Sequence, residues 1–288
     1  MRIVLKGANG NFEIGGGAHA NARLLDIQGI GLPSKEVTAA VFAGQSGQSI
    51  TSVRDSVRTI TMSFDFYVNP RTTQKLYGVL YAPVEICFCA SGGRYRITGQ
   101  CRDATDAERI IYHSWNKIAV QFVCDDPYFH DMQETKIAVA SYVNNFPNAY
   151  EDGKWLVSLP AVATERLTRI SVENKGVTKI YPKISVKKTN ATVGTSSSYG
   201  LKLINHTTGK TLEIDYRLTG TSDITVDLPR RKITDGNTNI TPYISDDTVL
   251  SDFYLTPGEN DIEVVTLDNA DLISVDLTFN NNYIGVAI

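Results

Sequence analysis

The chain has four histidines, and none has the spacing of a metal site or of a catalytic base. They are His19, His113, His130 and His206. Helical zinc sites place two histidines in an H-E-x-x-H pattern, which the sequence lacks. It also lacks the G-x-S-x-G turn that presents a nucleophilic serine. The histidines are therefore interpreted as structural or solvated side chains, and no catalytic residue is predicted.

Four cysteines could supply thiolate ligands. They are Cys87, Cys89, Cys101 and Cys124. The C-x-C spacing of the first two differs from the C-x2-4-C loop spacing of structural zinc sites. Among a zinc site, disulfides and buried reduced thiols, the last interpretation is favoured. No metal and no cofactor are predicted.

Two further segments are weighed as binding sites. Asp125 and Asp126 could form a paired-carboxylate or calcium site, but Pro127 follows, and D-D-P is typical of a turn that ends a strand. The glycine-rich segment from Gly10 to Gly17 has no Lys-Ser/Thr pair after it, so it lacks the groups that cradle phosphate. It is interpreted as a mobile loop.

Bulk properties exclude several functions. The 288 residues favour about two domains, because one core rarely grows beyond ~250 residues. The net charge of −3 argues against a protein that binds nucleic acid by neutralising phosphates. No apolar run approaches the ~20 residues that span a bilayer, and Lys6 interrupts the apolar start. We expect no sequence-specific nucleic-acid partner, no membrane insertion, and folding in a cytoplasm.

Residues 1–130 are predicted to form a β-rich, barrel-like unit with one short helix. The alternating apolar residues between Trp115 and Cys124 predict a strand with one buried face, ended by the D-D-P turn. Residues 59–68 alternate in the same way. Asn69-Pro70 predicts the N-cap and first turn of a helix that reaches about Tyr81. Arg2 to Leu5 is a candidate edge strand.

Residues 131–165 are predicted to be a connector, and residues 166–288 a second unit. Strands at near-regular spacing with turn residues between them predict an antiparallel β-sandwich. Asn205 to Lys210 predicts the loop of a hairpin in that unit. The fold class is therefore mainly β.

Short motifs follow one another along the chain. They are Gly29-Ile-Gly-Leu-Pro33, Arg58-Thr-Ile-Thr-Met-Ser-Phe64, Arg94-Tyr-Arg-Ile-Thr98, Trp115 through Phe129, Val172-Glu-Asn-Lys-Gly176, Ile180-Tyr-Pro-Lys-Ile184, Ile204-Asn-His-Thr-Thr-Gly209-Lys, Phe253-Tyr-Leu-Thr-Pro-Gly-Glu-Asn260 and Asn282-Tyr-Ile-Gly285. In this order and spacing the chain resembles the distal tail protein (Dit) family of long-tailed phages and phage-tail-like bacteriocins of Gram-positive hosts. The resemblance covers nearly the whole chain.

The resemblance implies a structural protein. An N-terminal split β-barrel would form a homohexameric ring at the end of the tail tube, and a galectin-like β-sandwich would project outward. The implied partners are the tail tube protein, the tail-associated hub (lysin) or fibre protein, and receptor-binding proteins. The implied location is the tail tip or baseplate of a virion or bacteriocin particle assembled in the host cytoplasm. The family has no catalytic residues to transfer.

One loop is the candidate for contacts within such a ring. Its six residues are Gly44, Gln45, Ser46, Gly47, Gln48 and Ser49. Loops of this composition are rarely packed in a core, so we expect them to protrude. With flanking strands at 37–43 and 50–60, they are predicted to form an arm that reaches a ring neighbour or the tail tube.

The alternative function is carbohydrate binding by the β-sandwich. Four aromatic residues could supply stacking platforms: Tyr243, Phe253, Tyr254 and Tyr283. Aromatic residues in a sandwich of this size belong more often to the core. The segment between residues 166 and 288 also leaves no room for an enlarged sugar-binding insertion, so no direct sugar binding is predicted.

Overall fold

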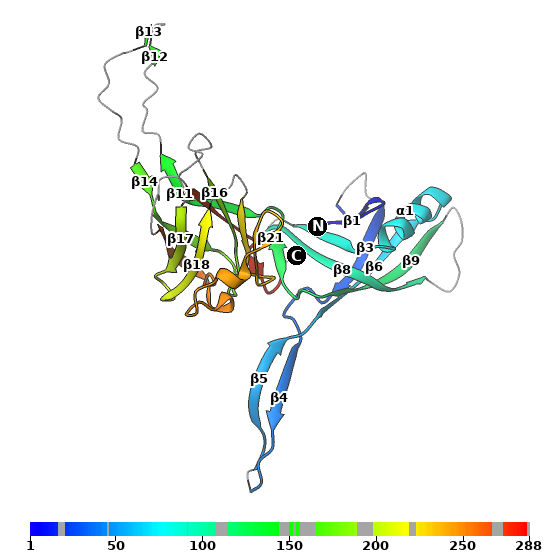
Figure 1. The fold of residues 1–288 in the computed structure, drawn as a ribbon. Helices are drawn as coiled ribbons and strands as arrows, with labels where there is room; N and C mark the ends of the chain where they lie inside the picture. Colours follow the sequence, from blue (N-terminus) through cyan, green and yellow to red (C-terminus); the bar gives the residue numbers. More distant parts are fainter. Residues whose placement is uncertain are drawn as a thin grey trace. The chain divides into compact units, whose positions relative to one another are not determined.

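The computed structural model divides into two units (Figure 1). The first contains Met1–Met132 and Asn282–Ile288, and the second contains Gln133–Asn281. The structure describes residues 1–16, 21–44, 46–90, 92–106, 114–143, 150–151, 154–155, 165–188, 198–218, 223–266 and 273–286. Gly17, His19, Gln45 and His113, discussed above, lie outside the described residues, as do residues 144–149, 152–153 and 156–164 of the predicted connector.

The first unit is built on a closed barrel. Its seven strands are β1 (Arg2–Gly7), β2 (Gly10–Ile14), β3 (Ala22–Gln28), β6 (Arg58–Tyr67), β7 (Val84–Ala90), β8 (Gly93–Asp106) and β9 (Trp115–Cys124). They follow the order β8-β7-β1-β2-β3-β6-β9, and β9 pairs back with β8 to close the sheet. Two short strands, β10 (Phe129–Asp131) and β24 (Asn282–Tyr283), extend it beside β8. The predicted barrel is confirmed.

The barrel core follows from the period of its strands. Side chains on a strand alternate between two faces, so every second residue of β6 and β9 points inward. Paired across these two strands are Ile60 with Phe122, Met62 with Val120 and Phe64 with Ile118, all fully buried. Each such side chain contributes about 1.5–3 kcal/mol when it leaves water.

The predicted helix is confirmed as α1 (Pro70–Leu80). The Asn69 side chain accepts hydrogen bonds from the backbone N–H groups of Arg71 (3.0 Å) and Thr72 (2.9 Å), which satisfies two donors that a helix start leaves unpaired. The helix buries Leu76 and Val79 against the barrel core.

Two expectations about the first residues were wrong. Arg2 to Leu5 is no edge strand, because β1 pairs with β2 on one side and with β7 on the other. The first part of the glycine-rich segment is no loop, since Gly10–Ile14 forms β2 with Phe12 and Ile14 buried. The partner strand β7 lies some eighty positions along the chain, and local composition does not indicate such a pairing.

The second unit consists mainly of two sheets, which confirms the predicted antiparallel sandwich. One has the order β14-β11-β23-β16-β19-β20-β21 and the other β15-β22-β17-β18. The strands are β11 (Thr135–Val143), β14 (Glu165–Leu167), β15 (Arg169–Asn174), β16 (Lys183–Lys188), β17 (Ser198–Asn205), β18 (Lys210–Leu218), β19 (Ile224–Asp227), β20 (Lys232–Asp235), β21 (Thr238–Asn239), β22 (Gly258–Thr266) and β23 (Ile273–Phe279). Strand β11, in the segment predicted as a connector, pairs with β23.

Smaller elements complete the described part. The ribbon β12 (Tyr150–Glu151) and β13 (Lys154–Trp155) forms a sheet of its own, and two 3-10 turns follow β21, η1 (Thr241–Tyr243) and η2 (Leu250–Asp252). The predicted hairpin is present as β17–β18, with the Asn205 side chain accepting from the N–H of Thr207 at 3.0 Å.

Candidate assembly interface

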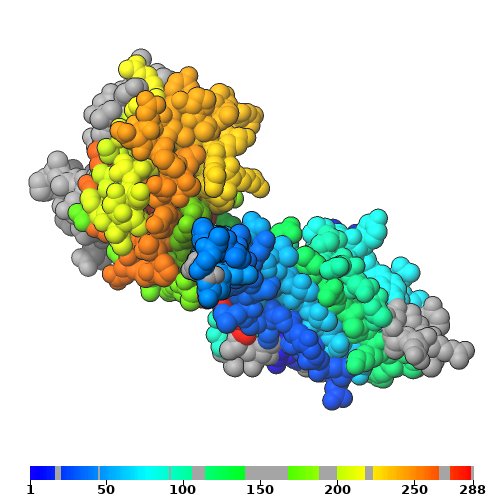
Figure 2. Space-filling view, turned by 90° about the horizontal axis from the view of Figure 1, so that it is seen from below, coloured from blue at the N-terminus to red at the C-terminus, as the bar shows by residue number. Residues whose placement is uncertain are grey.

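A two-stranded ribbon extends away from the barrel of the first unit. We call it the arm, and it consists of β4 (Lys35–Ala40), β5 (Ser49–Asp55) and the turn between them. The two strands pair with each other and with no other described strand. Figure 1 shows the arm as the long blue hairpin, and Figure 2 views it from its tip, nearest the viewer.

Large apolar side chains on the arm face solvent. Ile50 is 66% exposed, and Val37 and Val53 are about half exposed. Near the turn, Val41 and Phe42 are exposed as well. A lone two-stranded ribbon is at best marginally stable in water, and exposed apolar patches usually mark contact surfaces. The arm therefore has the composition of an element that packs against a partner.

The predicted contact residues lie at the end of this arm. Gly44, Ser46, Gly47 and Gln48 are exposed in the turn, and Ser49 is half-buried at the start of β5. Gln45 lies outside the described residues. The flanking strands are shorter than predicted, because β5 ends at Asp55 and residues 58–60 already belong to barrel strand β6.

The root of the arm is fixed by Arg58, which is only 2% exposed. Its Nη1 donates to the carbonyl oxygens of Gly29 (2.6 Å) and Gly31 (2.8 Å), on the segment that leads into β4. Its Nε donates to the carbonyl of Pro127 at 2.6 Å, and its Nη2 to that of Ile284 at 2.5 Å. One guanidinium group thus joins three segments that are far apart in sequence.

The residues after the D-D-P turn complete this root. The Phe129 ring is fully buried, and its centre lies 4.6 Å from the guanidinium carbon of Arg58. The same ring makes an edge contact with Phe88. The Tyr128 hydroxyl donates to the Asp55 carboxylate at 2.5 Å, where β5 ends. Burial, and next the hydrogen bond to Asp55, raise the pKa of Tyr128 to about 12. The turn interpretation of Asp125-Asp126-Pro127 is confirmed, because β9 ends at Cys124.

Residues 282–286 form a strap across the same region. Strand β24 pairs with β10, and the Tyr283 ring lies 5.0 Å from that of Tyr95. The Val286 N–H donates to the carbonyl of Ile30 at 3.0 Å, and the Val286 side chain is buried in the barrel core. The strap and Arg58 therefore hold the same arm-leading segment from two sides.

The role of Arg58 was missed from the sequence, although a signal was present. Arg58 has the same alternation phase as Ile60 and Met62, so the strand pattern places it on the buried face. A buried arginine needs acceptors for its five N–H donors. Its actual acceptors are backbone carbonyls up to 226 positions away, which local sequence cannot indicate.

The residues first considered for chemistry have structural surroundings. Cys87 and Cys124 are buried, and burial is the main cause that raises the pKa of each thiol to about 11. Neither thiol is therefore an activated nucleophile. All four cysteines are free, and Cys89 and Cys101 are half-buried rather than buried. His130 contacts the Asp126 carboxylate at 2.9 Å. Within the described ranges, no three His, Cys, Asp or Glu side chains are grouped to hold a metal ion.

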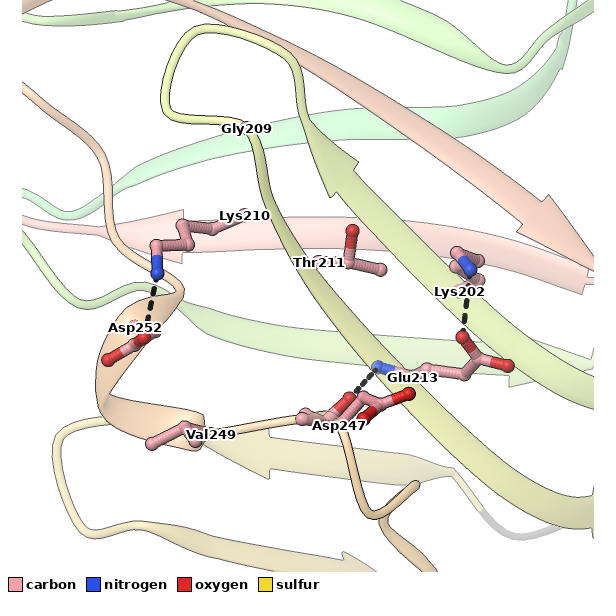
Figure 3. A pocket seen from close by; sticks show the side chains of 9 residues that line it. Lys202, Gly209, Lys210, Thr211, Glu213, Asp247, Val249 and Asp252 are labelled. Atoms are coloured by element: carbon pink, nitrogen blue, oxygen red, sulfur yellow. Dashed lines mark hydrogen bonds and ion pairs between the residues drawn. The ribbon is translucent and has the colours of Figure 1, made fainter.

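A shallow pocket of about 300 Å³ lies on the second unit, between β17–β18 and the segment around η2 (Figure 3). Two ion pairs occupy its lining, Lys202 with Glu213 and Lys210 with Asp252, each at 2.9 Å. The Thr248 hydroxyl accepts from the Glu213 N–H at 3.0 Å. The lysines of the pocket are thus neutralised within it.

The aromatic residues considered for carbohydrate stacking are buried or contact other aromatic rings. Phe253 is fully buried, and Tyr243, though half exposed, makes an edge contact with Tyr216 at 5.2 Å. Tyr254 contacts the Tyr181 ring, and the Lys179 ammonium group lies 5.2 Å from the Tyr254 ring centre. None of these aromatic side chains belongs to the lining of the pocket.

The second unit matches a described protein family. Residues 175–283 match the model of the siphovirus-type tail component, C-terminal domain. The second unit carries a siphovirus-type tail component domain. A search of curated proteins finds no match to the chain.

Solved structures agree in fold over nearly the whole chain. The crystal structure of the SPP1 Dit protein superposes with a TM-score of 0.61 at 14% identity, over 91% of this chain and 93% of that one. A chain of the phage P2 baseplate in its activated conformation with Ca superposes with a TM-score of 0.52 at 8% identity, over 99% of both chains. At such identities the likeness shows the fold.

Together with the family match, this confirms the resemblance to distal tail proteins. The chain has a Dit-like fold, and its second unit carries a domain of siphovirus-type tail components. No helix in the described part of the chain is long and apolar enough to cross a bilayer.

Proposed function

We propose that the tail component forms a homohexameric ring that joins the tail tube to the hub or fibre proteins. The observation that carries the proposal is the arm, whose exposed apolar side chains have no partner strand among the described residues of one copy. A ring supplies such a partner in every copy, because heterologous contacts repeat around a closed symmetry axis. The fold of this chain, shared with SPP1 Dit, is compatible with this role.

The comparisons support the kind of partner. The SPP1 protein is described as a paradigm of the hub adsorption apparatus in phages that infect Gram-positive bacteria, and the second relative is part of a baseplate. By analogy, the tail component contacts the tail tube protein on one side and a hub (lysin), fibre or receptor-binding protein on the other. It is assembled in the host cytoplasm, into a phage or a phage-tail-like bacteriocin. A chain with a net charge of −3 does not grip DNA that passes through the ring. The role is structural, without catalysis.

The loop from Gly44 to Ser49 is the proposed contact with a ring neighbour or with the tail tube. Light scattering behind a sizing column, with negative-stain imaging of the same peak, measures assembly of the wild type and of a chain lacking residues 44–49, each with and without the tail tube protein. We expect a species near six copies with an open centre for the wild type, and weakened assembly with an unchanged unfolding curve for the deletion. A deletion chain that forms full rings overturns the role of the loop, and a wild type that never assembles overturns the ring.

A further inference from the structure

The two faces of the arm differ in polarity. Residues opposite each other in an antiparallel ribbon point to the same side. Val37 lies opposite Val53 and Ala39 opposite Ile50, whereas Thr38 lies opposite Ser52. We call Val37, Ala39, Ile50 and Val53 the apolar face. The other side carries Thr38, Ala40, Ser49 and Ser52.

The outer part of the arm carries no charge. No Asp, Glu, Lys, Arg or His occurs from Val37 to Val53. The charged residues of the arm lie in its part nearest the barrel and pair there, Lys35 with Asp55 at 3.6 Å and Arg54 with Glu36 at 2.8 Å. Exposed strands normally carry charges that prevent contact with other chains. The arm lacks these charges from Val37 to Val53. This part of the arm is therefore suited to pack against an uncharged surface of another chain.

An uncharged surface of matching width lies on the barrel wall. The outward residues of β6 and β9 pair as Thr59 with Val123, Thr61 with Gln121 and Ser63 with Ala119. We call these six residues the uncharged band. Thr59 is exposed, the other five residues are partly exposed, and most of the six side chains are small. The band is two strands wide, like the arm, with Asp26 beside Ser63 on β3 and Asp103 beside Gln121 on β8.

The band cannot be covered by the arm of the same copy. It begins at Thr59, directly after the root at Arg58, and the arm extends away from the barrel strands there (Figure 1). We propose that the apolar face of the arm packs on the uncharged band of a second copy. This inference rests on the proposed ring and specifies its contact. Neutral surfaces of this kind meet without desolvating a charge, which would otherwise oppose association.

The contact joins different surfaces of the two copies, so each copy offers one arm and one band. Such a head-to-tail contact repeats until the ring closes. A copy with a damaged arm still has a working band, and a copy with a damaged band still has a working arm. A mixture of the two kinds can therefore form only one contact per pair.

This logic gives a mixing experiment. The arm variant is Val53→Asp, with Ser52→Asp on the opposite face as its matched control. The band variant is Thr61→Glu with Gln121→Arg, a cross-strand pair of opposite charge that keeps the net charge and places the arginine, not a second carboxylate, beside Asp103. Light scattering measures each chain alone and in mixtures, with and without the tail tube protein, at the concentration at which the wild type assembles.

We expect Ser52→Asp to assemble like the wild type and Val53→Asp to require about 100-fold more protein, because it would bury an unpaired carboxylate. The band variant alone should stay monomeric, and its equimolar mixture with Val53→Asp should give dimers and nothing larger. Full rings of the band variant, or a mixture that stays monomeric while the wild type forms rings, overturn the inference and leave the proposed function standing. A wild type that is monomeric under all conditions overturns both.

Discussion

The arm and its root are neighbours in sequence but differ in what surrounds their side chains. At the root, Arg58 and Phe129 are buried and every guanidinium nitrogen has an acceptor within the same copy. Along the arm, Val37 and Ile50 are exposed on a ribbon without other described strand partners. The root is explained by contacts within one copy, whereas the exposed residues of the arm gain a contact only in the assembly proposed above. Substitutions at the two places should therefore affect different measurements, folding at the root and assembly along the arm.

The largest effect is expected for Arg58→Ala. The change leaves four backbone carbonyls without their donor and should lower the free energy of unfolding by about 3–5 kcal/mol. Urea unfolding monitored by circular dichroism measures it. The matched control is Arg54→Ala on the arm, whose exposed ion pair with Glu36 is worth at most about 1 kcal/mol. Equal losses for both variants would contradict the contrast between root and arm.

A second comparison uses glycines with similar backbone angles. Gly29 at the root has φ +85°, and a Cβ there would lie 2.0 Å from the Thr59 carbonyl oxygen. Gly44 at the tip has φ +83°, with open space around its Cβ position. Gly29→Ala should lower the free energy of unfolding by about 2–4 kcal/mol. Gly44→Ala should lower it by only about 1 kcal/mol, because the unfavourable φ is its one cost. Thermal unfolding of the two variants separates steric from conformational cost, and a smaller loss at Gly29 would refute the packing described for the root.

The smallest effect concerns acid. Burial opposes ionisation of Asp126, but the hydrogen bonds from His130 and from the Tyr128 N–H outweigh it and lower the pKa of the Asp126 carboxyl. A lowered folded-state pKa stabilises the protein above the unfolded value near 4, and this stability is lost as the pH falls below it. Because the Asp126 side chain is 53% exposed, we expect less than about 1 kcal/mol. Unfolding measured from pH 6 to pH 3 should be less pH-dependent for Asp126→Asn. An unchanged slope would show that the turn does not depend on this carboxylate.

Local patterns in the sequence predicted much of the fold. The alternation of Ile60, Met62 and Phe64 predicted a core strand, and Asn69-Pro70 predicted the start of the helix, because each signal depends on neighbours within a few positions. The exposed turn of the arm was predicted from its glycine and serine content. The paired position of β1 was missed because it depends on β7, and closure of the barrel depends on pairing between β8 and β9.

The candidate interface was predicted in part. The loop from Gly44 to Ser49 was predicted to protrude, and its described residues lie in the turn of the arm and at the start of β5. The two faces of the ribbon, however, require the register of β4 against β5, which a bulge shifts between Thr38 and Ala39. The absence of charge from Val37 to Val53 is visible in the sequence and was the unused signal. The uncharged band could not be predicted, because β6 and β9 are about fifty positions apart and become neighbours only in the barrel.

The strap has a consequence for synthesis on the ribosome. Ile284 and Val286 complete the first unit, yet they emerge from the ribosome after the whole of the second unit. Until then the Arg58 guanidinium lacks one acceptor, and the segment leading into the arm is held from one side only. The first unit therefore matures last although most of it is translated first. This order delays completion of the arm's root until both units have been made.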